Sequence, residues 1–462
     1  MNSTRYASVI GITAVAALAG FLFGYDSAVI NGATEAIKER FTIGPGPLGF
    51  AVASALIGAA VGAFVAGSIS DRIGRIPVMK IAAVLFFVAA IGSGLAPNIE
   101  IFIAFRVVGG VAIGFASVIA PAYIAEIAPA HMRGRLGSLQ QLAIVTGIFL
   151  SQLVNKLFTD ASGGASQEFW MGLETWRWML LVCIVPALGY LVGAFSIPES
   201  PRFLVSTGRD ETAKAVLGRI LNPESVNDVF DRIKYSIHTE VKPSIKDVRG
   251  RAAGLKPIVW VGIGLAIFQQ FVGINVVFYY SNTLWQSVGF TESQSLLLSL
   301  ISATINVIVT IVAILLVDNW GRRPLLLTGS VGMALSLGTM AVVFQMAPVG
   351  ANGPILEGAS GPIALVCANL FVVFFGMSWG PIMWVMLGEM FPNKIRGAAL
   401  AVAGFAQWIA NFVVTQTFPI FANISLGLAY GLYATFAVLS LFFVLKWVPE
   451  TKGLELEDMK EE

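Results

Sequence analysis

Long, nearly uninterrupted runs of apolar residues restrict the possible folds of this chain more than any other feature. A helix needs about 20 apolar residues to cross the hydrocarbon core of a bilayer. Within lipid every backbone polar group must be paired, which leaves helices or a closed barrel, and these runs are too continuous for barrel strands. The sequence therefore predicts an all-α integral membrane protein with twelve transmembrane helices, at residues 8–30, 48–69, 77–96, 100–124, 136–158, 177–197, 257–284, 294–317, 324–346, 362–387, 398–421 and 426–448.

The distribution of charge predicts how the chain is oriented. Only 12% of the residues are charged, whereas soluble domains carry about 25%, and a dense mixture of both signs fills residues 199–256. The net charge of +2 gives no indication of a nucleic-acid partner. Short loops with Lys and Arg follow the second, fourth, eighth and tenth spans. Because such loops stay in the cytoplasm, we expect both termini and the 199–256 segment to be cytoplasmic.

Three short motifs occur twice, in the same order and at equivalent loops. Asp71–Arg75 recurs as Asp318–Arg323, Glu126 with Arg133 recurs as Glu389 with Arg396, and Pro198-Glu199 recurs as Pro449-Glu450. The repeat predicts two six-helix halves, residues 1–198 and 257–449, joined by a cytoplasmic linker at 199–256 and followed by a tail at 450–462. Halves related in this way form a known transporter plan, with the substrate site between them near mid-membrane.

The repeated charges place acids and bases at the cytoplasmic ends of neighbouring helices. Ion pairs there can latch the two halves when a carrier opens outward, and break when it opens inward. The alternative is that they only fix topology and anchor helix ends; for the repeated set we favour the latch. The predicted latch residues are Asp71, Arg75, Glu126, Arg133, Glu199, Arg202, Asp318, Arg322, Arg323, Glu389, Arg396 and Glu450.

Two ionisable residues, Asp26 and Arg106, lie well inside apolar spans. Each would cost at least ~2.5–3.5 kcal/mol if it faced lipid at the bilayer centre, so both are expected to face the bundle interior. Asp26 lies late in an outward-running span and Arg106 early in an inward-running one, which predicts similar depth and a pair. A carboxylate beside a guanidinium stays ionised, whereas a separated, desolvated one takes up a proton. The pair therefore predicts proton coupling; the alternative is a static ion pair.

Amide and aromatic side chains gather in several spans, mostly of the second half. They are Gln140-Gln141, Gln269-Gln270, Asn275, Tyr279-Tyr280, Asn306, Trp379, Trp384, Gln407-Trp408 and Asn411. Amides donate and accept hydrogen bonds, which suits sugar hydroxyls, and aromatic faces suit the apolar face of a pyranose. A single amide is explained equally well by an interhelical hydrogen bond, worth about 0.6 kcal/mol on average. The tandem Gln pair followed by Asn favours binding.

Glycine and proline predict where these spans bend. Gly273 lies between Gln270 and Asn275 and would let its span bend there, and Gly380-Pro381 indicates a helix break that lets a gate move. The two cysteines lie in apolar runs and suggest no disulfide framework. The sequence contains no metal-ligand cluster, phosphate loop or nucleophile elbow. We therefore expect no enzyme activity, no metal and no cofactor.

These residues make the chain similar to the sugar porter family of the major facilitator superfamily, across essentially its whole length. The motifs that carry the resemblance are Asp71–Arg75, Pro198–Leu204, Gln269–Asn275 with Tyr279-Tyr280, Gly321–Pro324 and Pro449–Gly453. Gly20–Gly32 resembles bacterial, particularly actinobacterial, glucose permeases. The resemblance implies the major facilitator fold, alternating access without a cofactor, and a linker of short cytoplasmic helices.

The resemblance also implies roles for individual residues. Sugar contacts carried over by motif position are Gln141, Gln269, Gln270, Asn275, Asn306, Trp384 and Trp408. Gln407 stands where a bacterial xylose/proton symporter has Gln and human facilitators have Asn. Asp26 matches the proton-coupled members, whereas the human facilitators carry Asn there. Residues expected to line or gate the cavity are Phe23, Tyr279, Tyr280, Gly380 and Pro381.

The combined prediction is a proton-coupled hexose importer, with glucose favoured, that spans the plasma membrane many times and works as a monomer. A uniporter or facilitator for the same sugar is the first alternative. A transporter-like sugar sensor is less favoured, because such receptors carry long cytoplasmic tails. A drug exporter fits the amide-rich site and the sugar-porter motifs poorly.

Overall fold

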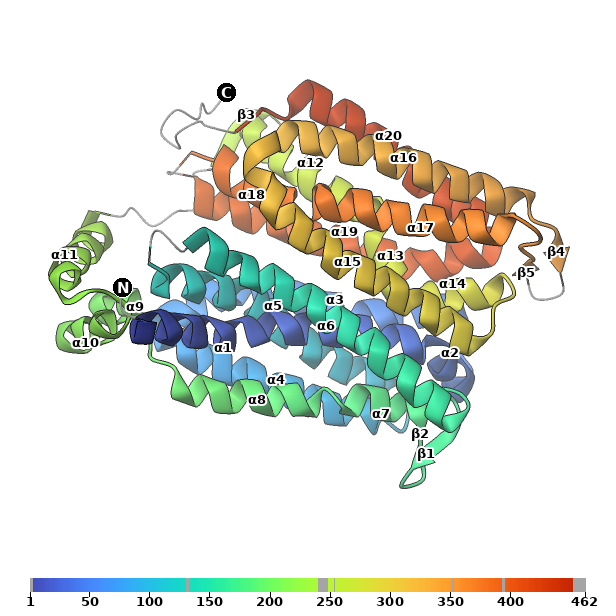
Figure 1. Ribbon diagram of the computed structural model, residues 1–462, viewed down its shortest axis with the longest axis horizontal. Coiled ribbons are helices and arrows are strands. Elements are labelled where there is room, and N and C mark those ends of the chain that lie inside the picture. The colour runs from blue at the N-terminus through green and yellow to red at the C-terminus, as the bar shows by residue number, and fades with distance from the viewer. Residues whose placement is uncertain are drawn as a thin grey trace. The chain divides into compact units, whose positions relative to one another are not determined.

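The computed structural model describes residues 3–129, 133–239, 248–252, 254–350, 353–392 and 395–451. Almost all of this chain is helical (Figure 1), as predicted. Twelve stretches of the described chain are long and apolar enough to span a membrane, which confirms the predicted number. They are Arg5–Phe41, Pro45–Ile73, Arg75–Gly94, Ile99–Ile127, Ser138–Ser162, Thr175–Ser196, Pro257–Tyr279, Glu292–Leu315, Arg322–Met346, Ser360–Met390, Arg396–Ile424 and Leu426–Trp447.

Eight of these stretches lie within single helices, and four combine two helices each. The single helices are α3 (Pro45–Ile73), α4 (Arg75–Gly94), α5 (Ile99–Ile127), α6 (Arg133–Ser162), α15 (Glu292–Trp320), α16 (Arg322–Met346), α19 (Arg396–Ile424) and α20 (Leu426–Trp447). The interrupted stretches pair α1 (Ser3–Ala28) with α2 (Ile30–Phe41), α7 (Thr175–Leu181) with α8 (Ile184–Ser196), α12 (Pro257–Phe271) with α13 (Ile274–Tyr279), and α17 (Ser360–Met377) with α18 (Trp379–Met390).

The remaining elements are short. The linker contains α9 (Pro201–Ser206), α10 (Asp210–Ile220) and α11 (Pro223–Thr239), which agrees with the expected short helices. Helix α14 (Ser281–Ser287) follows α13. Two antiparallel hairpins were not predicted: β1 (Glu168–Trp170) with β2 (Leu173–Glu174), and β4 (Val349–Gly350) with β5 (Gly353–Pro354). Strand β3 (Arg249–Ala252) precedes α12.

The chain divides into two compact units. The first consists of Met1–Ser27, Ile57–Gly147 and Leu180–Lys242, and the second of Ala28–Leu56, Ile148–Met179 and Pro243–Glu462. The units do not follow the repeat in the sequence, because α2 and parts of α3, α6 and α7 group with the later helices. The two six-helix halves, 1–198 and 257–449, therefore stay a prediction from the repeated motifs.

Small residues allow close helix packing within the first unit, where α4 packs against α5 and α8. A Cβ added at Gly58 would lie 2.1 Å from the carbonyl oxygen of Val107, and one at Gly114 would lie 2.4 Å from that of Ala59. These glycines let the backbones of α3 and α5 touch. Lipid offers helices no hydrophobic reason to associate, so such contacts contribute much of the packing energy.

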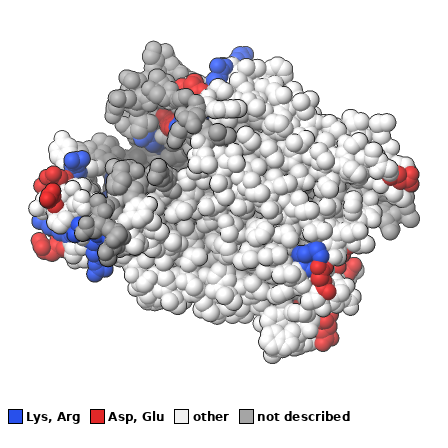
Figure 2. All heavy atoms as spheres, viewed as in Figure 1, with Lys and Arg blue, Asp and Glu red and all other residues white. Residues whose placement is uncertain are grey.

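The second unit packs α16 against α20 and α17, and α12 against α19. Figure 2 shows that Lys, Arg, Asp and Glu are absent from the visible sides of the long helices and gather at their ends. Many large apolar side chains on these sides are exposed, for example Leu315, Leu335 and Phe442 at 60–70%. Apolar exposure of this extent suits contact with lipid.

Candidate functional site

Asp26 and Arg106 meet inside the first unit. Asp26, near the end of α1, is 5% exposed and Arg106, in α5, is 3% exposed. The Arg106 Nη1 atom lies 3.2 Å from Asp26 Oδ2 and donates to it. Gly109, one helical turn from Arg106, makes room for the pair, since a Cβ there would lie 3.4 Å from Asp26 Oδ2. The pairing inferred from their depths in the sequence is present.

The clustered amides form a chain of hydrogen bonds in the second unit. Gln269 Oε1 accepts from Gln407 Nε2 at 2.7 Å and from Gln270 Nε2 at 3.1 Å, and Gln270 Oε1 accepts from Asn275 Nδ2 at 2.6 Å. Gln269 Nε2 donates to the carbonyl oxygen of Trp379 at 3.0 Å. The chain joins α12, α13, α18 and α19 through amide side chains of two predicted spans and the main-chain carbonyl of Trp379 in a third. Amides that satisfy one another in this way can exchange partners with sugar hydroxyls.

The amide chain lies beside two helix interruptions. Helix α12 ends at Phe271, and Gly273 has φ of 85°, a left-handed conformation that glycine adopts without strain. The predicted bend at Gly273 is confirmed. The second interruption is at Ser378, not at Gly380-Pro381 as predicted. Gly380 and Pro381 lie in the first turn of α18, where a proline removes no intrahelical hydrogen bond.

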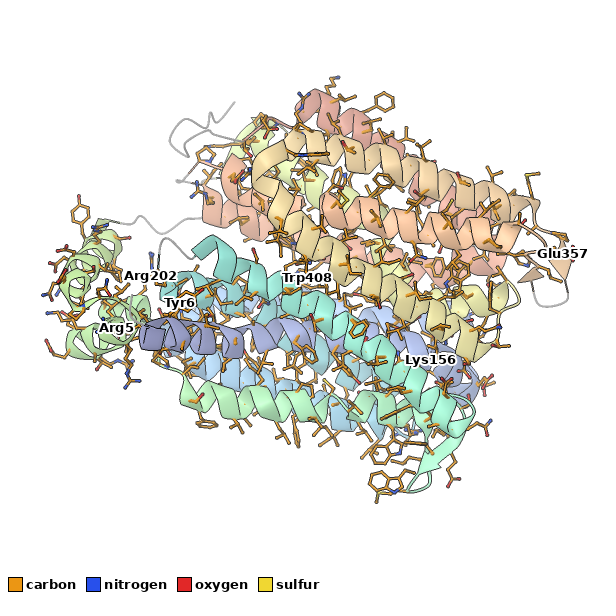
Figure 3. All side chains as sticks on the ribbon, viewed as in Figure 1. Arg5, Tyr6, Lys156, Arg202, Glu357 and Trp408 are labelled. Atoms are coloured by element: carbon orange, nitrogen blue, oxygen red, sulfur yellow. The ribbon has the colours of Figure 1, made fainter. Side chains whose placement is uncertain are left out.

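The other predicted sugar-binding and gating residues are distributed over both units. In the first unit, Phe23 and Gln141 are half-buried. In the second, Asn306, Trp408, Tyr279 and Tyr280 are buried, and the Tyr280 hydroxyl donates to the carbonyl oxygen of Thr415 at 3.0 Å. Trp384 is 44% exposed. Figure 3 labels Trp408 on α19.

The family resemblance implies a sugar contact for Gln141 and none for its neighbour Gln140. Gln140 is 7% exposed, and neither its Oε1 nor its Nε2 has a hydrogen-bond partner among the described residues. Its side chain packs on Gly20 of α1, where a Cβ would lie 2.8 Å from Gln140 Nε2. A buried amide without partners costs free energy, so the position calls for a ligand, water or another conformation.

A second buried polar cluster was not predicted, and we call it the Asn31 network. It comprises Asn31 of α2, Gln152 of α6, Ser281 and Asn282 of α14, and Ser299 of α15. Asn31 is fully buried; its Nδ2 donates to Gln152 Oε1 at 2.9 Å and to the hydroxyls of Ser281 and Ser299, each at 3.2 Å. Its Oδ1 accepts from the backbone N–H of Asn282 at 2.9 Å. One asparagine thus ties helices of the predicted first half to helices of the second.

Unsatisfied polar atoms lie close to the Asn31 network. Asn282 Nδ2 and Asn155 Oδ1 are buried without a hydrogen-bond partner in the described chain, as is the hydroxyl of Thr159, one turn after Asn155. Asn155 packs on Gly32, next to Asn31, and donates to the carbonyl oxygen of Val29 at 3.1 Å. Such atoms raise the free energy of the packed arrangement. The sequence shows Asn31 and Gln152 as polar residues far apart in the chain, and it gives no indication that they contact each other.

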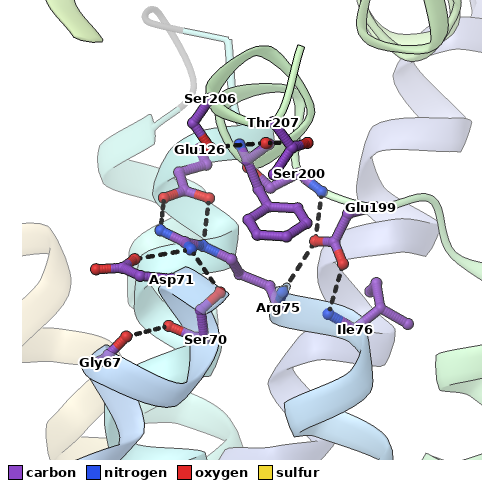
Figure 4. Close-up of polar contacts among 11 residues, drawn as sticks. Gly67, Ser70, Asp71, Arg75, Ile76, Glu126, Glu199, Ser200, Ser206 and Thr207 are labelled. Carbon is purple, nitrogen blue, oxygen red and sulfur yellow. Dashed lines mark hydrogen bonds and ion pairs between the residues drawn. The ribbon is translucent and has the colours of Figure 1, made fainter. Parts of the chain in front are cut away.

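The repeated loop motifs fold into matching clusters. In the first, Arg75 makes a two-nitrogen contact with Glu126, at 2.9 and 3.1 Å, and pairs with Asp71 at 3.0 Å (Figure 4). Glu199 accepts from the backbone N–H groups of Arg75 and Ile76 at 3.0 and 3.1 Å. Glu199 thus caps the first turn of α4, where the helix dipole favours a negative charge.

The second cluster repeats the first nearly atom for atom. Arg322 contacts Glu389 through two nitrogens at 2.9 and 3.2 Å. Glu450 accepts from the backbone N–H groups of Arg322 and Arg323, both at 3.0 Å, and so caps α16. The Arg–Glu pairs lie within one predicted half each, whereas the capping carboxylates Glu199 and Glu450 come from the segment directly after that half. The sequence repeat therefore corresponds to a repeated three-dimensional device.

The remaining latch residues make other contacts. Arg396 donates to the carbonyl oxygen of Phe391 at 3.0 and 3.2 Å, and Arg323 Nη2 to that of Leu445 at 2.7 Å. Arg202 is half-buried on α9 and is labelled in Figure 3. The side chains of Arg133 and Asp318 lie outside the described residues. A latch between the halves stays a prediction. Among the described residues, no group of three His, Cys, Asp or Glu side chains is placed to hold a metal ion.

Comparison with known proteins agrees with this geometry. Residues 12–462 match the family described as sugar (and other) transporter. The chain is 54% identical over 453 residues to a glucose transport protein of Synechocystis, covering 98% of this chain and 97% of the relative. It is 38% identical over 499 residues to the D-xylose-proton symporter of Escherichia coli K12, covering 99% and 96%.

Solved structures are similar as well. An inward-open structure of the xylose transporter XylE from E. coli matches with a TM-score of 0.83 at 38% identity, covering 98% of this chain and 99% of that one. The proton:xylose symporter XylE bound to 6-bromo-6-deoxy-D-glucose matches with a TM-score of 0.79 at the same identity and coverage. Twelve apolar stretches of the described chain that are long enough to span a membrane, the duplicated charged clusters and these matches lead to one conclusion: the chain belongs to the sugar transporter family of the major facilitator superfamily and is a multi-pass membrane protein, not an enzyme.

Proposed function

We propose that this protein imports a hexose, with glucose favoured, together with a proton, by alternating access across the plasma membrane. The observation that carries the proposal is the buried pair of Asp26 and Arg106, 3.2 Å apart. A buried charge pair contributes little to stability by itself, and removing one partner is costly. A carboxylate inside a membrane span is by default a functional site. The relative named a D-xylose-proton symporter supports the same role here.

The amide chain supports a sugar as the substrate. Gln269, Gln270, Asn275 and Gln407 offer donors and acceptors that hydrogen-bond one another without a charge among them. A neutral polyhydroxyl substrate can replace these bonds one for one. The relatives named as glucose transporters, from Synechocystis and Staphylococcus epidermidis, favour glucose. The family resemblance adds Trp384, Trp408, Gln141 and Asn306 as proposed sugar contacts, and Phe23, Tyr279 and Tyr280 as proposed cavity or gate residues.

The Asn31 network supports alternating access. In the proposed cycle, the predicted halves separate at the outer ends of their helices to admit sugar. The bonds from Asn31 to Ser281, Ser299 and Asn282 must then break, while its bond to Gln152 stays within the first half. The unsatisfied atoms of Asn155, Thr159 and Asn282 gain water on opening, which offsets part of that cost. The cytoplasmic latch residues are proposed to act at the opposite ends, with both termini inside the cell.

Proton coupling decides whether the carrier can concentrate sugar. One proton per sugar is worth about 2.3 kcal/mol per 100 mV, which is more than a tenfold concentration ratio because each 1.4 kcal/mol is about tenfold. The test is uptake of labelled glucose into proteoliposomes, with and without an acid-outside pH gradient. Symport predicts accumulation above equilibrium that a protonophore abolishes. Equal uptake with and without the gradient favours the uniporter instead. We propose that the monomer in the bilayer is the working unit, and the same assay at one chain per vesicle tests this.

A further inference from the structure

The β1–β2 hairpin presents apolar side chains at its turn. Met171 and Gly172 form the turn and both have left-handed φ angles, 54° and 73°. Met171 is 74% exposed and Trp170 is 61% exposed. A left-handed conformation is unfavourable for methionine and persists only where the surroundings impose it. A polar turn residue such as Asn would fit this backbone better and would suit water. The hairpin therefore retains an exposed apolar tip against local preference.

Aromatic contacts hold the hairpin in a fixed position on the neighbouring helices. The rings of Trp170 and Trp178 are 5.0 Å apart, and Trp178 Nε1 donates to the carbonyl oxygen of Trp170 at 3.0 Å. Phe169 stacks on Phe158 of α6 at 5.4 Å. Figure 3 shows the ring side chains gathered around β1 and β2. The tip is thus a rigid apolar surface joined to α6 and α7.

The chain on either side restricts how far the hairpin can lie from the bilayer. It starts six residues after Ser162, where one membrane span ends, and Glu174 directly precedes Thr175, where the next begins. The carboxylate of Glu174 is paired at the base of the hairpin, 2.7 Å from Arg177 Nε. Figure 1 shows β1 and β2 projecting sideways from the ends of α6 and α7. The tip therefore lies at the level where hydrocarbon gives way to headgroups.

We infer that the β1–β2 hairpin is a membrane anchor whose tip, Phe169–Met171, inserts into the interfacial layer of the outer leaflet. Tryptophan rings are favoured at this level because one end is apolar and the N–H can reach polar groups. Leu157, 56% exposed on α6, adds an apolar side chain directly before Phe158, which contacts the hairpin. The anchor fixes the depth of the ends of α6 and α7, and α6 also carries Gln152 of the Asn31 network. Only the assignment of the tip to the outer leaflet rests on the proposed orientation of the chain.

The depth of residue 171 tests the inference directly. Met171→Cys is labelled with a nitroxide and reconstituted into phosphatidylcholine vesicles, and collision rates with oxygen and with a water-soluble nickel chelate are compared. The native chain gives the background, since Cys183 and Cys367 are buried. The matched control is Glu357→Cys, an exposed residue (labelled in Figure 3) in the loop between β5 and α17. We expect oxygen collisions to exceed nickel collisions at residue 171 and the reverse at residue 357.

Two outcomes would overturn the anchor. If residue 171 collides with the nickel chelate as often as residue 357, the tip lies in water. If it is shielded from both reagents and its spectrum shows spin–spin broadening, the tip packs against a second copy of the chain. Glucose uptake by the same vesicles is measured in parallel. Active transport with a water-exposed tip rejects the anchor alone, whereas a lipid-immersed tip without transport rejects the proposed function alone.

Discussion

Arg106 holds Asp26 through a single nitrogen that serves two acceptors. Nη1 lies 3.2 Å from the carboxylate Oδ2 and 3.2 Å from the main-chain carbonyl oxygen of the same residue. Arg106 Nε is buried and has no hydrogen-bond partner in the described chain. A guanidinium can grip a carboxylate with two parallel bonds, and here it does not. The carbonyl contact needs no charge on the Asp26 side chain, so this part of the interaction does not depend on the carboxylate.

Asp26→Asn is expected to separate coupling from transport. The amide keeps the size of the carboxylate and the carbonyl contact to Arg106, but carries no exchangeable charge. In proteoliposomes the variant should exchange glucose and fail to accumulate it under an acid-outside gradient. Glu100→Gln, at the exposed start of α5, is the control and should accumulate glucose like the native chain. Gradient-driven accumulation by the Asn variant would refute Asp26 as the proton site.

Gln270→Ala is expected to weaken sugar binding. The change removes two links of the amide chain, the bond to Gln269 and the bond from Asn275, together with the donor and acceptor that Gln270 is proposed to offer the sugar. Losing one partner of a buried hydrogen bond costs about 1–3 kcal/mol, or about 5- to 150-fold in dissociation constant. Binding of labelled glucose to purified protein measures it.

The control for this variant is Thr304→Ala, which removes an exposed hydroxyl on α15 that bonds only its own helix. It should leave the dissociation constant within about twofold, since surface changes stay within about 0.5 kcal/mol. An unchanged affinity in Gln270→Ala would remove this residue from the proposed site.

Two variants near the Asn31 network should act in opposite directions. Asn31→Ala leaves Ser281, Ser299 and the Asn282 N–H without their shared partner. It should destabilise the packing of α2 against α14 by about 1–3 kcal/mol. Thr159→Val keeps the shape and removes a hydroxyl that has no partner in the described structure, so it should tighten the contact. Hydrogen exchange of the amides in α2 and α14 should become faster in the first variant and slower in the second. Changes of the same sign in both would contradict the assigned roles.

Glycines 67 and 74 provide a paired test of helix termination. Gly74 has φ of 102°, and a Cβ there would lie 2.4 Å from the carboxylate of Glu199, so Gly74→Ala should displace the cap and lower the melting temperature. Gly67, within α3, has open space around the added methyl, and Gly67→Ala should stabilise the helix by up to about 1 kcal/mol. Thermal unfolding in detergent measures both. If Gly74→Ala and Gly67→Ala had equal melting temperatures, the Glu199 cap would contribute nothing to the stability of the folded protein.

The spans, the repeat and the pairing of Asp26 with Arg106 were predictable from sequence because each follows from a strong local signal. A charge in an apolar run must face inward, and depth along two antiparallel spans then leaves few partners. The bend at Gly273 was also predictable, since the glycine lies between Gln270 and Asn275 and only glycine takes a positive φ without cost. These predictions require only the presence of a membrane and the direction of each span. They require no information on how the helices pack.

The Asn31 network and the amide order could not be predicted, since both depend on which helix faces touch. Asn31 and Gln152 are single amides in separate spans, and their meeting with Ser281 and Ser299 is a result of helix rotation. The sequence did not indicate the helix break at Ser378, because the glycine and proline that predicted a break are Gly380 and Pro381, farther along the chain. Trp170 and Met171 also stayed unremarked, since a hairpin of seven residues is too short for a periodic pattern to be recognised.

The interruption at Gly273 has a mechanical consequence. Helix α13 has six residues, about 9 Å of rise at 1.5 Å each, with the amide chain at its start and Ser281 and Asn282 just beyond its end. A sugar that takes the hydrogen bond of Asn275 acts on one end of this short helix, and the residues after its other end, Ser281 and Asn282, are bonded to Asn31. Since a left-handed glycine separates α13 from α12, it can tilt without bending a continuous helix. In the proposed cycle, occupancy of the site and closure above it are then coupled through the movement of this one short helix.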